Sequence, residues 1–187
     1  NARSIVVEED YISKDYLHDY AAYYALCFKP YPKKCRRLHL FSVAFSQKEF
    51  EQYLLEDTAA THKFWVSYLG FIVVRPIPAR VVGYSVLKIY TQKSGESPRH
   101  FWGTRHYTVH LFGKEIHLSS LAFQEQDTVV AACATTAIWV ALSKASVDFP
   151  VILSPPSQIT ANAGNTNDGS RLFPNKGLSI QQICQAF

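Results

Sequence analysis

The sequence predicts an α+β fold, because stretches with helical spacing of apolar residues alternate with short strand-like runs. Of the 187 residues, 48% are hydrophobic and 18% are charged, a composition typical of a folded globular chain. That length accommodates one domain of ordinary size, or one small domain and part of another. A stretch rich in serine, glycine and proline at 91–104 divides the chain into an N-terminal α/β region, 1–103, and a second region, 104–187.

Two helices and three strands are expected in the first region. Ser13 is placed to cap a helix over 14–27, and Ser46-x-x-Glu49 is a capping box for a helix that ends near residue 57. The first helix carries a stripe of tyrosines that indicates a core or an interface: Tyr16, Tyr20, Tyr23 and Tyr24. Strands are predicted at 37–45, 71–74 and 83–90. In the first of these strands the alternation indicates three buried residues: Leu38, Leu40 and Val43.

The second region begins with a predicted β-hairpin. Its strands are 107–112 and 115–121, and they flank the two-residue turn Gly113-Lys114, in which glycine comes first. That register places His110 opposite His117. Two facing imidazoles could form a pH switch or half of a metal site, whereas the ordinary alternative is a polar face of the sheet.

The hairpin is followed by a polar segment that leads into an alanine-rich helix, expected over 131–145. Cys133 lies at the start of this helix, and Gln124 and Gln126 precede it. A helix N-terminus stabilises the thiolate, which is the nucleophilic form of cysteine. An upstream glutamine amide can donate a hydrogen bond to the oxyanion formed when a thiolate attacks a carbonyl group. The alternative interpretation of Cys133 is a small buried residue within the helix.

The C-terminal part of the chain is expected to be a long loop followed by a short helix. Residues 154–177 are rich in turn-forming residues, and long loops of this kind are often functional. Ser179-x-x-Gln182 is a second capping box, and the helix that it begins reaches Phe187 without a capping residue. Further structure is therefore expected beyond Phe187.

Several of these motifs together resemble the papain-like cysteine peptidases, including their bacterial C39-like branch. The motifs are Gly70-Phe-Ile-Val-Val-Arg75-Pro76, His110-Leu-Phe-Gly113, Phe123-Gln-Glu-Gln126-Asp127, Cys133-Ala-Thr-Thr-Ala-Ile-Trp139 and Gly177-Leu-Ser-Ile-Gln-Gln-Ile. The resemblance covers about residues 65–187. This stretch is similar to a group of uncharacterised bacterial proteins. It implies that region 104–187 is the first part of a papain-like core, with its closing sheet cut off or incomplete.

The same resemblance assigns roles to individual residues. Cys133 would be the nucleophile and Gln126 the oxyanion donor, with Gln124 as the second choice. The Gln126-to-Cys133 separation is one residue longer than in papain-like enzymes. The family order is Cys, then His, then Asn or Asp, and no histidine follows Cys133. The catalytic histidine would then lie outside this chain, or be His106, His110 or His117 in a rearranged order.

Composition limits the partners and the location. The net charge of +4 is too small to indicate nucleic-acid binding, and the basic run 29–37 is interpreted as a solvated connector in preference to a polyanion patch. No apolar run reaches the length of a membrane span, and no signal peptide is recognised. The four cysteines lack metal-site spacing and the chain is long enough to fold without disulfides, so no metal or cofactor is expected and a reducing cytoplasm is predicted.

The leading hypothesis from the sequence is a bacterial cysteine hydrolase that acts on peptide or amide bonds through an acyl-enzyme at Cys133. The alternative hypothesis is a non-catalytic papain-like module that binds a peptide or protein partner through its groove or through the tyrosine stripe. The oligomeric state is left open by the sequence.

Overall fold

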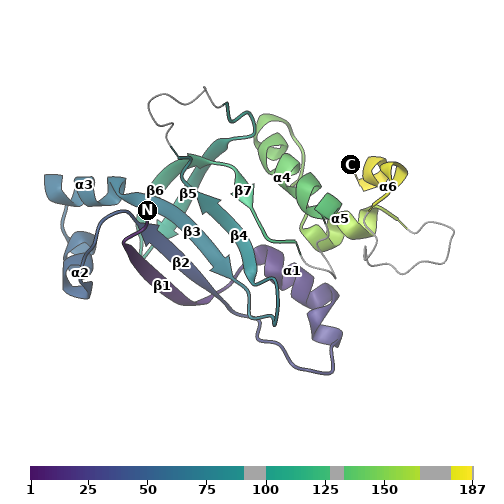
Figure 1. Ribbon diagram of the computed structural model, residues 1–187, viewed down its shortest axis with the longest axis horizontal. Helices are drawn as coiled ribbons and strands as arrows, with labels where there is room; N and C mark the ends of the chain where they lie inside the picture. The colour runs from purple at the N-terminus through teal and green to yellow at the C-terminus, as the bar shows by residue number, and fades with distance from the viewer. Residues whose placement is uncertain (91–99, 127–132, 165–177, 187) are drawn as a thin grey trace.

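The computed structural model describes residues 1–90, 100–126, 133–164 and 178–186 (Figure 1). The strands in these ranges are β1 (Ser4–Tyr11), β2 (Cys35–Phe41), β3 (Tyr68–Val74), β4 (Val82–Leu87), β5 (Arg105–Leu111), β6 (Lys114–Ser120) and β7 (Ala122–Phe123). The helices are α1 (Lys14–Ala22), α2 (Gln47–Leu55), α3 (Ala59–Val66), α4 (Cys133–Asp148), α5 (Pro156–Asn162) and α6 (Ile180–Ala186). The α+β class is confirmed, and the papain-like core stays a prediction.

The main sheet has five antiparallel strands in the order β1-β2-β3-β4-β7. The strand β7 comes from the second predicted region and pairs with β4 of the first, with Ser85 opposite Phe123. The sheet therefore continues across the proposed division at 103/104. That division stays a prediction, and residues 91–99 of the expected connecting loop lie outside the described residues.

The β5–β6 hairpin covers one face of this sheet. Its two strands alternate strictly between buried and outward-facing residues, so one side of the hairpin belongs to the core. Arg37 of β2 donates a 2.7 Å hydrogen bond to the carbonyl oxygen of His110, and the Ser120 hydroxyl donates to the carbonyl oxygen of Leu87. These bonds fix the hairpin to the sheet at two separate points.

The hairpin turn lies one residue earlier than expected. Leu111 pairs with Lys114, so the turn residues are Phe112 and Gly113, with φ values of 46° and 83°. Positive φ at both positions is the type I′ pattern, in which glycine comes second and not first. The shift places His110 opposite Glu115 and His117 opposite Thr108, so the predicted pair of facing histidines was wrong.

The buried face of β2 is also opposite to the prediction. Cys35, His39 and Phe41 are buried, whereas Leu38 and Leu40 are half-buried and Val43 is exposed. The apolar residues of β2 lie on both of its faces, and the hairpin covers the face that carries a histidine. Alternation alone could not identify this face, because a buried histidine resembles a solvent-facing polar residue in sequence.

The caps and the tyrosine stripe were predicted more successfully. The Ser13 side chain accepts from the amide of Tyr16, and the capping boxes of Ser46 and Ser179 are both formed. Tyr16 and Tyr24 are buried in the core, and Tyr16 packs against Tyr20 at 6.2 Å between ring centroids. Among the described residues, four elements were missed: β1, α3, the short strand β7 and the helix α5 within the expected loop.

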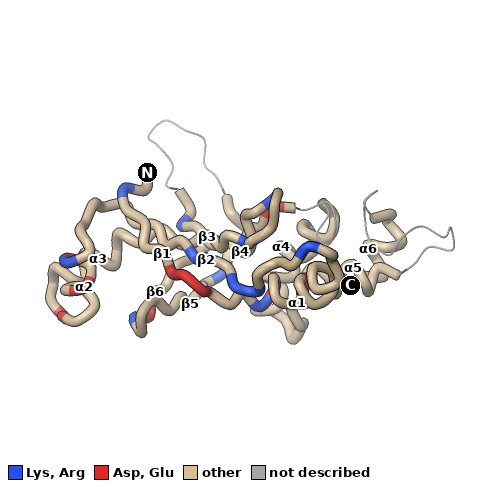
Figure 2. Tube along the Cα trace, turned by 90° about the horizontal axis from the view of Figure 1, so that it is seen from below, with Lys and Arg blue, Asp and Glu red and all other residues tan. Residues whose placement is uncertain are grey.

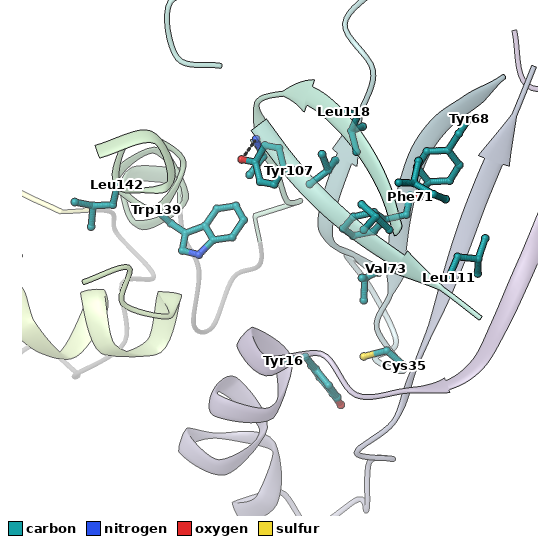
Figure 3. Packing of buried hydrophobic residues seen from close by; sticks show 14 of the residues in the cluster. Tyr16, Cys35, Tyr68, Phe71, Val73, Tyr107, Leu111, Leu118, Trp139 and Leu142 are labelled. Atoms are coloured by element: carbon teal, nitrogen blue, oxygen red, sulfur yellow. Dashed lines mark hydrogen bonds between the residues drawn. The ribbon is translucent and has the colours of Figure 1, made fainter. Parts of the chain in front are cut away.

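The helices gather at the two ends of the sheet (Figure 1). At one end α2 and α3 enclose an aromatic cluster around Phe41, whose ring stacks on Phe64 at 5.1 Å. At the other end lie α1, α4, α5 and α6. Figure 3 shows Trp139 pointing from α4 toward the sheet, and Tyr16 of α1 facing Cys35 of β2 in a separate part of the core. The helix that carries Cys133 is thus attached to the side of the sheet that ends in β7.

We expect Gly70→Ala to destabilise the fold by about 2 kcal/mol. Gly70 has a φ of 120°, and a Cβ atom there would lie 2.1 Å from the carbonyl oxygen of Val86 on the neighbouring strand. Gly113→Ala is the matched control, because Gly113 also has a positive φ but a Cβ atom added there would meet nothing within 4 Å beyond its own chain neighbours. The control should cost about 1 kcal/mol in urea unfolding, and equal losses would contradict the close-approach argument.

Candidate functional site

Cys133 is the first described residue of α4 and its side chain is exposed, as the nucleophile hypothesis requires. The alternative of a buried structural cysteine does not describe this residue. Residues 127–132 lie outside the described part of the chain, so the predicted strand-to-helix turn between Gln126 and Cys133 lies there too. The geometry of the site is therefore built from α4 on one side and from residues 122–126 on the other.

The helix α4 is held on the sheet by buried contacts. Trp139 is fully buried and its indole packs edge-on against Tyr84 of β4, with 5.5 Å between ring centroids. Ser143 forms a 3.0 Å hydrogen bond with the Tyr107 hydroxyl, which also accepts from the amide of Ala122 in β7. Figure 3 shows this hydrogen-bonded tyrosine between α4 and the hairpin. These contacts give α4 a fixed position relative to β7, the strand that precedes the glutamines.

The two glutamines differ sharply in their surroundings. Gln124 directly follows β7, is only 3% exposed, and its buried side-chain Nε2 has no hydrogen-bond partner within the described part of the chain. Gln126 is exposed. A buried amide donor without an acceptor costs about 1 to 3 kcal/mol, so the position of Gln124 requires an explanation. Of the two predicted candidates, only Gln124 is buried.

The backbone on both sides of Gln124 is fixed. Phe123 pairs with Ser85, and Glu125 bonds with Val82 through its amide at 2.9 Å and through a side-chain oxygen at 3.2 Å. The buried guanidinium of Arg75 donates to the carbonyl oxygen of Glu125 at 3.2 Å. These bonds fix the backbone position from which the Gln124 side chain extends.

The three histidines proposed for a rearranged order are not joined to Cys133. His106, His110 and His117 all lie on the exposed face of the hairpin. His117 contacts Glu115 at 3.4 Å and Thr108 at 3.3 Å. Within the described ranges, no hydrogen bond connects a histidine to the Cys133 sulfur. The ordinary interpretation of the hairpin as a polar sheet face therefore fits its outer side.

A buried polar chain that the sequence did not suggest crosses the face of the sheet under the hairpin. His39 is 0% exposed, and its Nδ1 lies 2.9 Å from the Tyr68 hydroxyl while its Nε2 lies 3.3 Å from a Glu8 oxygen. Arg37 donates to the same Glu8 oxygen at 2.7 Å. Burial lowers the pKa of His39 to about 4, with the nearby Arg37 charge as a second cause. The only sequence signal for the burial of His39 was its position in the strand, where it shares a face with Cys35 and Phe41.

No group of three potential metal ligands occurs among the described residues. Cys27, Cys35, Cys133 and Cys184 are free thiols. Burial raises the pKa of the Cys35 thiol to about 11, which makes this cysteine unreactive at neutral pH.

Comparison with known protein families, with characterised proteins and with solved structures finds no match. Among the helices that the structure describes, none combines the length and apolar character needed to cross a lipid bilayer. The function must therefore be argued from the residues themselves.

Proposed function

We propose that the protein is a cysteine hydrolase in which Cys133 attacks a peptide or amide carbonyl and the Gln124 amide stabilises the oxyanion. The observation that carries this proposal is the buried Gln124 Nε2, which has no hydrogen-bond partner among the described residues and is held on a fixed backbone. An exposed thiol in the first described turn of α4 supports it, because a nucleophile must be accessible to its substrate. We therefore rank Gln124 above Gln126 as the donor.

The reaction would proceed in two halves. The Cys133 thiolate forms a bond to the substrate carbonyl carbon, and the carbonyl oxygen becomes an anion that accepts a hydrogen bond from Gln124. The tetrahedral intermediate collapses, the C–N bond breaks, and the amine leaves with a proton from a general acid. Water then adds to the thioester, the C–S bond breaks, and the carboxylic acid and the thiol are released. The histidine that takes and returns these protons is proposed to lie outside this chain.

A non-catalytic module remains the second candidate, and the absence of any histidine hydrogen-bonded to Cys133 among the described residues favours it. The two candidates differ in a direct test. An enzyme requires Cys133, so Cys133→Ala would abolish hydrolysis in a protein that includes the general base. A binding module would keep its partner affinity after the same substitution.

We expect iodoacetamide to modify Cys133 before the other three cysteines at neutral pH. Cys184 is the matched internal control, because it is also exposed but lies on the short helix α6. Cys27 is half-buried, and Cys35 is buried with a raised pKa, so these two should react more slowly, with Cys35 last. Timed alkylation followed by peptide mapping measures the order. Labelling of Cys133 after Cys184, or only after unfolding, would remove the basis for a nucleophile.

A further inference from the structure

A groove of about 700 Å³ runs along β1 at the edge of the sheet farthest from β7. We call it the β1 groove. Its walls come from β1, from the helix α2, from Phe45 and from the hairpin turn. The lining residues are Ser4, Ile5, Val6, Val7, Phe45, Gln47, Phe50, Glu51, Leu54 and Phe112. The groove is separate from the proposed catalytic site, because β2, β3 and β4 lie between β1 and β7.

The groove follows the open side of β1 and not a face of the sheet. Successive residues of a strand point to opposite faces, so four consecutive residues can line one groove only along an edge. Residues 4–7 are four such consecutive residues. β1 pairs with β2 alone, and no backbone hydrogen bond forms on the outer side of Ser4–Val7 among the described residues. The backbone N–H and C=O groups on that side are available to an added strand.

This half of the edge lacks the usual protection against pairing. Natural edge strands carry charges or prolines that discourage another strand from adding. In β1 the charges are confined to Glu8, Glu9 and Asp10, beyond the groove. Along the groove the strand presents Ile5, which is 53% exposed, and Val7, which is 43% exposed. The unprotected half of the edge therefore coincides with the groove.

Phe112 gives an independent indication that the groove has a role. It lies at the hairpin turn with a φ of 46°, packs against Phe50 at 6.1 Å, and is still 63% exposed. A bulky side chain in the left-handed region is strained, and glycine or asparagine would relieve that strain. A strained, exposed aromatic residue at the rim of an apolar groove is expected where the ring contacts a ligand.

The charge around the groove selects the kind of partner. β1 contains three acidic residues and no basic one; Glu8 is paired with Arg37 and Asp10 with Lys34, whereas Glu9 and the groove-lining Glu51 form no ion pair among the described residues. Figure 2 shows this acidic run of β1 in a chain whose net charge is positive. Two carboxylates in or beside the groove, without a cationic partner among the described residues, attract a basic segment.

We propose that the β1 groove binds an extended peptide segment with alternating apolar side chains and flanking basic residues. The segment adds to the sheet as a strand beside β1. One set of its side chains enters the groove against Phe50, Leu54 and Phe112, and its basic residues lie near Glu9 and Glu51. The interaction is independent of Cys133.

The test uses fluorescence anisotropy with a labelled peptide, Lys-Val-Thr-Val-Thr-Val-Thr-Val-Lys, at low ionic strength. We expect saturable binding, and an affinity reduced at least about tenfold when glutamate replaces both lysines. Two further peptides carry N-methyl groups on all valines or on all threonines. Because alternate N–H groups point to one edge of a strand, only one of these two peptides should lose binding. Equal behaviour of the two N-methylated peptides would rule out strand addition.

Variants of the protein locate the site. The pair Ile5→Lys with Val7→Lys should weaken binding at least about tenfold, whereas Val147→Lys, an exposed apolar position on α4, should not change it. Phe112→Asn should weaken binding and yet keep or raise the midpoint of thermal unfolding, because it relieves the strained turn. If Phe112 had only a structural role, the substitution would leave binding unchanged and lower the midpoint of thermal unfolding. Cys133→Ala should bind the peptide as the unsubstituted chain does, so failure of the hydrolase proposal would leave this result intact.

Two outcomes would overturn the proposal. One is the absence of saturable binding up to about 1 mM peptide. The other is a concentration-dependent dimer in sedimentation that the Ile5→Lys and Val7→Lys pair dissociates, with no peptide binding, because the occupant would then be a second copy of the chain.

Discussion

Replacing Gln124 with alanine is expected to slow the acylation of Cys133 about a hundredfold, or roughly 3 kcal/mol in the barrier. On the proposed mechanism, the buried Gln124 amide, which has no hydrogen-bond partner among the described residues, gains one only when the substrate oxygen becomes negative. An interaction made only in the transition state raises the rate directly. The measurement is the rate of p-nitrophenol release from p-nitrophenyl acetate, with mass spectrometry to confirm that Cys133 is acylated.

The control separates an oxyanion effect from a change in the thiol. Iodoacetamide alkylates sulfur by displacement at a carbon that bears no developing oxyanion. Gln124→Ala should therefore leave the alkylation rate of Cys133 unchanged while it lowers the acylation rate. Gln126→Ala is the matched variant, because Gln126 is exposed and two residues away, and it should affect neither rate.

Each other pattern of rates has a definite meaning. If Gln126→Ala and not Gln124→Ala lowers the acylation rate, the assignment that the resemblance favoured is correct and ours is wrong. If neither variant changes acylation, the oxyanion is stabilised by backbone amides. If both rates fall together in Gln124→Ala, the glutamine supports the position of Cys133 and does not act on the substrate.

The choice between the two glutamines illustrates what sequence reasoning could reach in the candidate site. The polar segment, the helix and the exposed thiol of Cys133 all followed from local patterns. Burial of Gln124 depends on the pairing of β7 with β4. In the chain, the end of β4 at residue 87 and the start of β7 at residue 122 are separated by the hairpin and the loop before it. A long-range pairing of this kind leaves no periodic signal in a two-residue strand, so burial could not be assigned from the segment itself.

The fold shows the same limit. Helix caps were predicted correctly because a serine and its partner three residues later interact locally. The hairpin register failed by one residue because types I′ and II′ place glycine differently, and Phe112 occupies a position that bulky residues rarely adopt. The prediction of the buried side of β2 failed because the hairpin that covers it lies some 70 residues further along the chain, at His110. Features set by local interactions could be predicted from the sequence, whereas features set by tertiary contacts could not.

The second large effect concerns His39 and acid stability. Burial lowers the pKa of His39 from 6.5 to about 4 in the folded protein, since the ring is fully enclosed between Tyr68 and Glu8. In the unfolded chain the ring is in water and takes up a proton near pH 6.5. Between pH 6.5 and pH 4 the unfolded state therefore binds more protons than the folded state does. Folding stability must fall as the pH is lowered through this window.

The size of the effect follows from the two pKa values. Near pH 7.5 both states carry a neutral ring, and the contribution vanishes. By pH 4.5 the difference costs the folded state roughly 2 to 3 kcal/mol. His39→Gln removes the titrating group, so its destabilisation relative to the unsubstituted chain, caused by the lost hydrogen bonds and packing, should shrink by that amount between pH 7.5 and pH 4.5.

Urea unfolding of both proteins at several pH values measures this difference, and other acidic groups cancel because both proteins contain them. His62→Gln is the matched control, since His62 is exposed beside Asp57 and should show no comparable pH-dependent change. A constant gap between His39→Gln and the unsubstituted chain from pH 7.5 to pH 4.5 would mean that Glu8 stabilises a charged His39. The contact between Glu8 and His39 would then be an ion pair under the hairpin.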